Sequence, residues 1–260
     1  MDFVKRHSLS IGLALMFALT WPFYGQLGLF VGYGLAAACL IVTALTQGAN
    51  GTKALLRRFL LWRVGAKWYA VAFVVPVAIY TAAMLLQTIV SGSPPDFDDT
   101  LSRSIFGDSA AIWLFIVPFF LTDALTNGEE LAWRGFVLPR YQTRFSALVS
   151  SLVVGVIWGL WHLPKVAPDG AWAVAYAILH NVALAILFTW VYNSTRGSLL
   201  LATLFHAAFN TAYVFLPRAA TGGENIVMGG VVLAVEYFAA ATVVAFACPS
   251  DLSRFSRVVE

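Results

Sequence analysis

Long apolar stretches recur along the whole chain, and they constrain its fold more than any other feature. A helix needs about 20 apolar residues to cross the hydrocarbon core of a bilayer, and we count about eight such stretches. Their expected limits are residues 9–24, 27–45, 69–90, 110–133, 147–163, 172–192, 199–216 and 231–248. Because lipid offers no hydrogen bonds to the backbone, the sequence predicts an all-α, polytopic membrane helix bundle.

The composition supports this fold class. Of the 260 residues, 60% are hydrophobic and only 11% are charged, whereas soluble domains carry about 25% charged residues. The sequence contains no repeat that would divide it, so we expect one membrane domain over residues 1–260 with a motif-bearing core at about 110–216. Cys39 and Cys248 form neither a disulfide framework nor a metal-binding spacing. The expected partner is the bilayer, with no nucleic acid.

The basic residues are distributed unequally between the two predicted sides of the membrane. Eight spans would place both termini on one side, together with 13 of the 16 lysines and arginines. Only Arg103, Lys165 and Arg218 would lie opposite, in company with the acidic loop 91–109, which holds Asp96, Asp98, Asp99 and Asp108. The positive-inside rule then predicts that both termini, and the end of the bundle that carries Glu129, face the cytoplasm.

Residues 52–67 alternate leucines and phenylalanine with several arginines. This pattern predicts an amphipathic basic helix that lies on the inner membrane surface and is held there by anionic lipid. A substrate-docking surface is the alternative for this segment, although nothing else in the sequence supports it.

Charged residues gather where the fourth apolar stretch ends, in the sequence Glu129-Glu130-Leu131-Ala132-Trp133-Arg134. An ionised side chain inside a bilayer costs roughly 2.5–3.5 kcal/mol by insertion scales, so a cluster of three suggests a function. In a helix, Glu130 and Arg134 are spaced i, i+4 and can form an ion pair, while Glu129 points about 100° away. The alternative is a charged cluster at the membrane edge whose groups all reach water.

Three of the four histidines, His162, His180 and His206, lie within apolar stretches. Pro164 should end or bend the helix that carries His162. His206 and Asn210 are four residues apart and share a helix face. For His180 we expect an interhelical hydrogen bond. A carboxylate, imidazoles and an amide on separate helices could instead activate water and stabilise an oxyanion, or hold a zinc ion.

The same residues resemble three short motifs of the CPBP family of intramembrane endopeptidases, which includes CAAX prenyl protease 2 (Rce1-like) and abortive-infection (Abi) proteins. The family motifs EExxxR, FxxxH and HxxxN correspond to three sets of residues in chain order. They are Glu129-Glu130 with Arg134, Trp158 with His162, and His206 with Asn210. One position departs from the family pattern, because Trp158 stands where the family has phenylalanine.

The resemblance implies an intramembrane endopeptidase, of the glutamic or the metallo type, that cleaves a membrane-associated or lipidated peptide. It assigns Glu129 to the activation of water, His162 to water or the oxyanion, and His206 with Asn210 to the orientation of water or the substrate carbonyl. Glu130 and Arg134 match a structural ion pair, and Trp158 a supporting aromatic. No cofactor is certain from these residues. If the enzyme uses zinc, its ligands would come from Glu129, His162 and His206.

Other classes of function are less consistent with the sequence. It contains no HExxH zinc motif, and neither GxSG nor GxGD, which mark other intramembrane proteases. A proton-coupled transporter could use Asp123, Glu236 and the Glu/His set, but no inverted repeat is present. For Asp123 we expect a polar contact near the carboxylates, and for Glu236 a hydrogen bond between helices or a protonated acid. A non-catalytic immunity factor or membrane scaffold of the same family is a third alternative.

Overall fold

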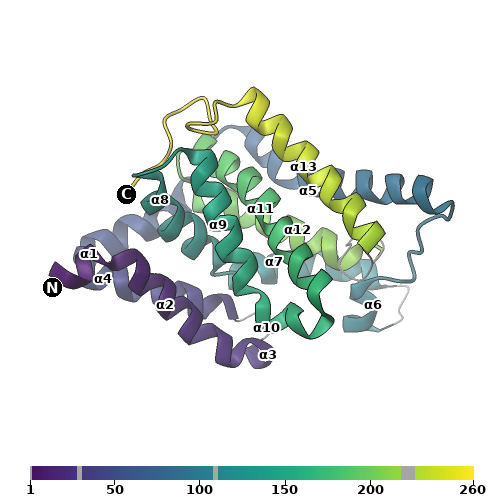
Figure 1. The fold of residues 1–260 in the computed structure, drawn as a ribbon, viewed down its shortest axis with the longest axis horizontal. Coiled ribbons are helices and arrows are strands. Elements are labelled where there is room, and N and C mark those ends of the chain that lie inside the picture. The colour runs from purple at the N-terminus through teal and green to yellow at the C-terminus, as the bar shows by residue number, and fades with distance from the viewer. Residues whose placement is uncertain (1, 28–30, 108–110, 218–225) are drawn as a thin grey trace.

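The computed structural model describes residues 2–27, 31–107, 111–217 and 226–260, and these are mostly helical (Figure 1). Among them, a single isolated bridge between Thr100 and Pro217 is the only β-type pairing. The predicted all-α membrane bundle is confirmed. Asp108, Ala110 and Arg218, which entered the sequence predictions, lie outside the described residues.

Most of the longer helices follow the predicted apolar stretches, and short helical turns connect several of them. The helices are α1 (Asp2–Arg6), α2 (Ser8–Thr20), α3 (Tyr24–Leu27), α4 (Val31–Arg57), α5 (Ala66–Ser91), α6 (Leu101–Phe106), α7 (Ile116–Thr126), α8 (Leu138–Gln142), α9 (Ala147–Trp161), α10 (Leu163–Val166), α11 (Ala171–Ser194), α12 (Leu199–Phe215) and α13 (Ile226–Phe246). The shorter 3-10 and π segments are η1 (Trp21–Phe23), η3 (Arg58–Leu60), η4 (Ile112–Phe115), η5 (Leu131–Val137) and η6 (Ala167–Asp169).

The predicted count of eight spans is not confirmed. Among the described residues, four helices are long and apolar enough to cross a membrane, and a bent pair, Ala147–Trp161 with Leu163–Asp169, makes five. The apolar helices Ser8–Phe23 and Leu199–Phe215 are shorter than the others. The fourth predicted span is divided, because α7 ends at Thr126 and η5 begins only at Leu131.

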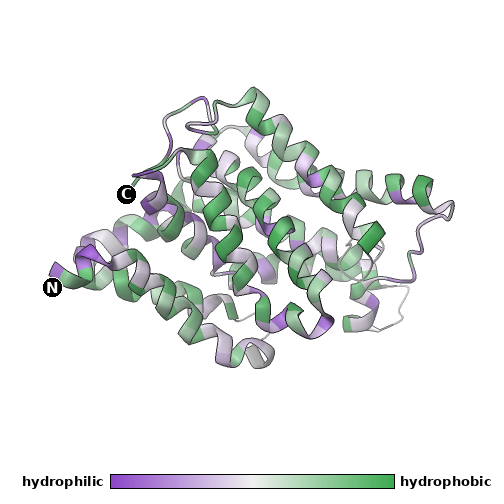
Figure 2. Ribbon diagram, viewed as in Figure 1, coloured by the Kyte–Doolittle hydropathy of each residue, from purple (hydrophilic) through white to green (hydrophobic). Residues whose placement is uncertain are grey.

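The helices surround a centre formed by α9, α11 and α12 (Figure 1). Helices α2 and α4 pack together on one flank, and α5 and α13 pack together on another. Figure 2 shows hydrophobic residues along most of the long helices, with hydrophilic residues near the N-terminus and around α8. Large apolar side chains such as Leu125 (79% exposed) and Phe238 (76%) point outward, which suits a surface that contacts lipid.

The predicted amphipathic helix at residues 52–67 is only partly correct. Gly48 has a φ of +68°, so α4 changes direction there and its last two turns form a separate helical segment. That segment continues through η3 but ends at Leu60, and α5 does not begin until Ala66. Glycine allows this bend because it has no Cβ to clash at positive φ.

The break before the charged cluster is fixed by a close approach of two glycines. A Cβ on Gly128 would lie 2.1 Å from the carbonyl oxygen of Gly32 on α4, and a Cβ on Gly32 would lie 2.7 Å from the nitrogen of Gly128. Only glycine on both sides permits this contact between backbones. Helix α4 therefore packs directly against the point where the chain turns into the charged segment.

The helix that carries His162 ends as the sequence predicts. Helix α9 stops at Trp161, His162 occupies its C-terminal cap, and Pro164 lies in the first turn of α10. The two parts meet at a bend of 48°. Since proline has no N–H to donate and clashes with the preceding turn, it fixes the bend directly after the imidazole.

Candidate active site

The charged cluster leads into a wide helical turn. Residues Leu131–Val137 form η5, a π-helix in which every residue is buried. Ahead of it, the Oδ1 atom of Asn127 accepts the backbone N–H of Glu129 at 2.9 Å. π-helical turns are rare and often occur at functional sites. The sequence argument assumed regular α-helical spacing here, so it did not predict this turn.

Glu130 binds both Arg134 and His206. Its Oε1 accepts a hydrogen bond from Arg134 Nη1 at 3.0 Å, which confirms the predicted i, i+4 ion pair. The same oxygen lies 2.8 Å from Nδ1 of His206 on α12. The side chains of Glu130 and Arg134 are both 0% exposed. Glu130 therefore connects the charged segment to α12 and fixes the orientation of the His206 ring.

Glu129 is held differently, with one oxygen engaged and the other facing His206. The indole N–H of Trp158 donates to Oε2 of Glu129 at 2.7 Å, and the indole N–H of Trp133 donates to it at 3.3 Å. The second oxygen, Oε1, lies 3.9 Å from Nε2 of His206. The Glu129 side chain is 13% exposed, so it is the more accessible of the two carboxylates.

Arg134 lies between two aromatic rings beneath these carboxylates. Its guanidinium carbon is 4.5 Å from the ring centre of Trp158 and 4.3 Å from that of Phe188 on α11. Such contacts favour a cation that is removed from water. Among the described residues, Arg134 Nε and Nη2 and Glu130 Oε2 are buried without a hydrogen-bond partner. These atoms are donors and an acceptor that water or a substrate could satisfy.

His162 lies beside this centre without touching either carboxylate. Its Nδ1 is 2.9 Å from the carbonyl oxygen of Trp158, and its ring centre is 6.2 Å from that of Trp158. No hydrogen bond or ion pair joins His162 to Glu129 or His206 within the described ranges. Since a carbonyl only accepts, Nδ1 must carry the proton, and in the neutral ring Nε2 is then an acceptor.

Asn210 lies one helical turn after His206, and its amide nitrogen lies 3.2 Å from both carboxylate oxygens of Asp123 on α7. Asp123 is buried. The expected polar contact of Asp123 is therefore confirmed, although its partner is Asn210 and not one of the two glutamates. This hydrogen bond ties α7 to α12 and leaves the amide oxygen of Asn210 as an acceptor.

The arrangement does not suit the zinc site considered from the sequence. Across residues 2–27, 31–107, 111–217 and 226–260, no group of three or more histidine, cysteine, aspartate or glutamate side chains could hold a metal ion. His206 directs Nδ1 to Glu130, and Glu129 uses Oε2 for two indoles. Zinc requires about four ligands in a tetrahedral arrangement, and Glu129, His162 and His206 do not converge in that way.

Two members of the site were missed by sequence reasoning. Trp133 was not expected to bind Glu129, although its spacing of four residues after the carboxylate could have suggested the contact. Phe188 lies in a uniformly apolar helix and carries no signal that distinguishes it from core. The sequence also assigned Glu130 only to Arg134, whereas it binds His206 as well.

His180 forms a second, separate contact between helices. Its Nδ1 lies 2.8 Å from Oε1 of Glu236 on α13, and the ring of Tyr176 stacks on it with centres 5.6 Å apart. The predictions of an interhelical hydrogen bond for His180 and for Glu236 are both confirmed.

Fold and site together define an integral membrane protein with a buried centre of two carboxylates, an arginine and an imidazole. Comparison with known proteins shows which family this chain is similar to. Residues 108–212 match the family model described as type II CAAX prenyl endopeptidase Rce1-like. The matched region holds all three motifs, so the resemblance on which the sequence interpretation is based is confirmed.

Individual relatives agree with the family match. The chain is 27% identical over 216 residues to CAAX prenyl protease 2 of Methanococcus maripaludis, with 78% of this chain and 77% of that protein covered. It is also 31% identical over 138 residues to the uncharacterized protein YyaK of Bacillus subtilis, covering 51% of this chain and 42% of YyaK. Similarity to a family of CAAX proteases supports an endopeptidase function in general.

Proposed function

We propose that the protein hydrolyses a peptide bond of a membrane-associated or lipidated substrate, with water activated by Glu129. The observation that supports this proposal is that the two carboxylate oxygens of Glu129 have different contacts. Oε2 is held by Trp158 and Trp133, while Oε1 faces Nε2 of His206 at 3.9 Å. One water molecule at about 2.8 Å from each atom could bridge that distance.

Charge balance suggests the protonation state of His206. Glu129 and Glu130 together carry two negative charges, and Arg134 supplies one positive charge. A protonated His206 would make the buried centre neutral, which lowers the cost of desolvation. Its Nδ1–H then donates to Glu130, and its Nε2–H can donate to the substrate carbonyl oxygen.

The reaction follows from these positions. Glu129 takes a proton from water on Oε1, and the water oxygen attacks the carbonyl carbon of the scissile bond. The resulting oxyanion accepts a hydrogen bond from His206. When the carbon–nitrogen bond breaks, Glu129 returns its proton to the leaving amine, so the products are a carboxylic acid and an amine. The acid then loses its proton to the amine or to water and leaves as a carboxylate. Nε2 of His162 would accept a hydrogen bond from the attacking water, and Asn210 would help to position the carbonyl.

The relative named CAAX prenyl protease 2 suggests a prenylated peptide ending as the first substrate to test. We further propose that the chain forms one membrane domain over residues 1–260. Both termini and the opening of the site would face the cytoplasm, as the distribution of 13 and 3 basic residues suggests.

The proposal can be tested by comparing the C-termini of membrane proteins in cells that carry the wild-type chain, Glu129→Gln or Glu236→Gln. We expect cleaved termini that depend on Glu129 and persist in Glu236→Gln, because Glu236 lies outside the proposed site. The purified wild-type protein should cleave a farnesylated CAAX peptide with and without a chelator.

Identical termini in all three strains would instead favour a non-catalytic family member. Complete loss of cleavage with the chelator, restored by added zinc, would overturn the metal-free mechanism.

A further inference from the structure

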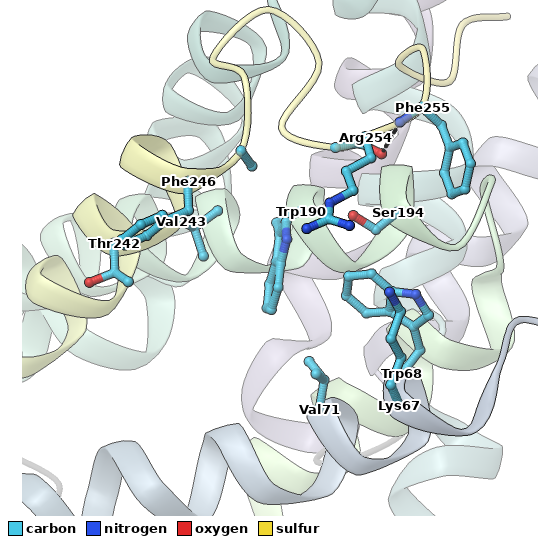
Figure 3. Close-up of a pocket in the computed structure, with 12 residues that line it drawn as sticks. Lys67, Trp68, Val71, Trp190, Ser194, Thr242, Val243, Phe246, Arg254 and Phe255 are labelled. Atoms are coloured by element: carbon cyan, nitrogen blue, oxygen red, sulfur yellow. Dashed lines mark hydrogen bonds between the residues drawn. The ribbon is translucent and has the colours of Figure 1, made fainter.

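A cavity of about 380 Å³ opens where the first turn of α5, the end of α11 and the end of α13 meet the C-terminal segment (Figure 3). It shares no lining residue with the Glu129 centre. Figure 3 shows the Arg254 side chain extending beside Ser194, with Trp190 on one wall and Lys67 with Trp68 on the other. From these residues we infer that the cavity binds an anionic phospholipid, whose phosphate lies between the two cations.

The charge of the cavity favours an anion. Lys67 and Arg254 line it, and none of its lining residues is acidic. Both side chains belong to exposed residues, and in the described parts of the chain neither forms an ion pair. The nearby carboxylate of Asp251 accepts hydrogen bonds from Ser250 and from the backbone of Arg257. The positive charge of the cavity is therefore not neutralised within the protein.

The remaining walls suit the rest of a phospholipid. The rings of Trp68 and Trp190 meet edge to face with centres 5.1 Å apart, and tryptophan favours the boundary between lipid and water. Val71, Val243 and Phe246 continue the wall along the helices, and Phe246 is 89% exposed. An acyl chain could lie along these apolar residues while its headgroup stays near the hydroxyl of Ser194.

The place of the cavity in the fold agrees with this ligand. It lies at the ends of three of the four helices that are long enough to cross a membrane, namely α5, α11 and α13. Helix ends of this kind lie at the level of lipid headgroups. Basic pockets between membrane helices bind anionic headgroups, whereas a soluble anion would gain nothing from the apolar wall.

The experiment measures thermal unfolding of the purified full chain in mild detergent, together with the lipid retained in native mass spectrometry. Phosphatidylglycerol, phosphatidylcholine of the same chain length and inorganic phosphate are added separately. Lys67→Gln with Arg254→Gln removes both cations of the cavity. Lys53→Gln with Arg144→Gln is the matched control, since both residues are exposed, lie outside the cavity and remove the same charge.

We expect phosphatidylglycerol alone to raise the unfolding temperature of the wild type and the control. A cation near an anionic headgroup strengthens binding about fivefold, so the cavity variant should bind about 25-fold more weakly. Equal binding by both double variants would overturn the proposal in favour of general charge attraction. If inorganic phosphate raised the unfolding temperature as much as phosphatidylglycerol does, the cavity would bind an adventitious ion only. If phosphatidylcholine raised it equally, the cavity would be a groove that any lipid fills. Size-exclusion chromatography confirms that each variant is folded.

Discussion

Two pairs of glutamate and histidine join helices in this protein, and their contacts are nearly the same. Glu130 lies 2.8 Å from His206, and Glu236 lies 2.8 Å from His180. Both glutamates are 0% exposed. Judged by the pair alone, either could be the reactive centre of a membrane enzyme.

The surroundings of the two pairs differ. Around Glu130 and His206 lie Arg134 and a second carboxylate, Glu129, one oxygen of which remains directed at the imidazole. The pair of Glu236 and His180 has a stacked Tyr176 and no arginine among the described residues within ion-pair distance. We infer that such a pair by itself joins helices, whereas the proposed transfer of a proton to and from water requires the additional carboxylate and arginine.

The largest expected effect is on catalysis and comes from replacing Glu129. Within the part of the chain that the structure describes, the pair of Glu236 and His180 has no carboxylate in the corresponding place. Glu129→Gln should lower kcat for a farnesylated CAAX peptide by about 10³-fold, because a general base contributes about 10²–10⁴-fold. The variant should still elute as a folded protein, since glutamine can accept the hydrogen bonds of Trp158 and Trp133. Activity within a few fold of the wild type would remove Glu129 from its assigned role.

The next effect concerns stability. Glu130→Ala leaves Arg134 buried without its carboxylate, and breaking a buried ion pair costs about 3–5 kcal/mol. Glu236→Ala leaves only a histidine, which can be neutral, so its free energy of unfolding should fall by less. Denaturant titration in detergent compares the two variants. A larger loss in Glu236→Ala would contradict the distinction drawn between the two pairs.

A moderate effect is expected from Trp158→Phe, which keeps a ring above Arg134 but removes the N–H that binds Glu129. A hydrogen bond to a charged group is worth about 1.5–3 kcal/mol, so kcat should fall about tenfold with KM nearly constant. Trp161→Phe is the matched control, because its indole binds Thr20 and not Glu129.

In Trp161→Phe, kcat should stay within about twofold of the wild-type value. The free energy of unfolding should fall by about 1 kcal/mol, because one hydrogen bond is lost. Equal losses of kcat in the two tryptophan variants would mean that ring packing, and not the hydrogen bond to Glu129, explains the effect.

The smallest effect on catalysis is expected from substitutions in the pair of Glu236 and His180. Glu236→Gln combined with His180→Gln should keep kcat within about twofold, because amide side chains can preserve a hydrogen bond between α11 and α13. The same peptide assay measures this. A loss of more than tenfold would show that the second pair takes part in the reaction, and would revive the alternative of a proton relay.

Prediction from the sequence was most successful where it depended on short spacings. The i, i+4 rule gave the ion pair of Glu130 and Arg134, and proline chemistry gave the bend after His162. It was wrong about the full extent of the helix at residues 52–67, because hydropathy cannot show that Gly48 turns the backbone or that the helix ends at Leu60.

The sequence by itself determined that the chain is an apolar helical bundle and which residue types carry chemistry, since both follow from composition and local spacing. Only the tertiary structure decided that Glu130, and not Glu129, binds Nδ1 of His206, and that Trp158 donates to Glu129. These contacts join Glu129 and Glu130, which directly precede η5, to residues of α9 and α12 that follow 29 and 76 positions later in the chain. Their geometry depends on the contact between Gly32 and Gly128 and on a π-helical turn, and local propensity encodes neither.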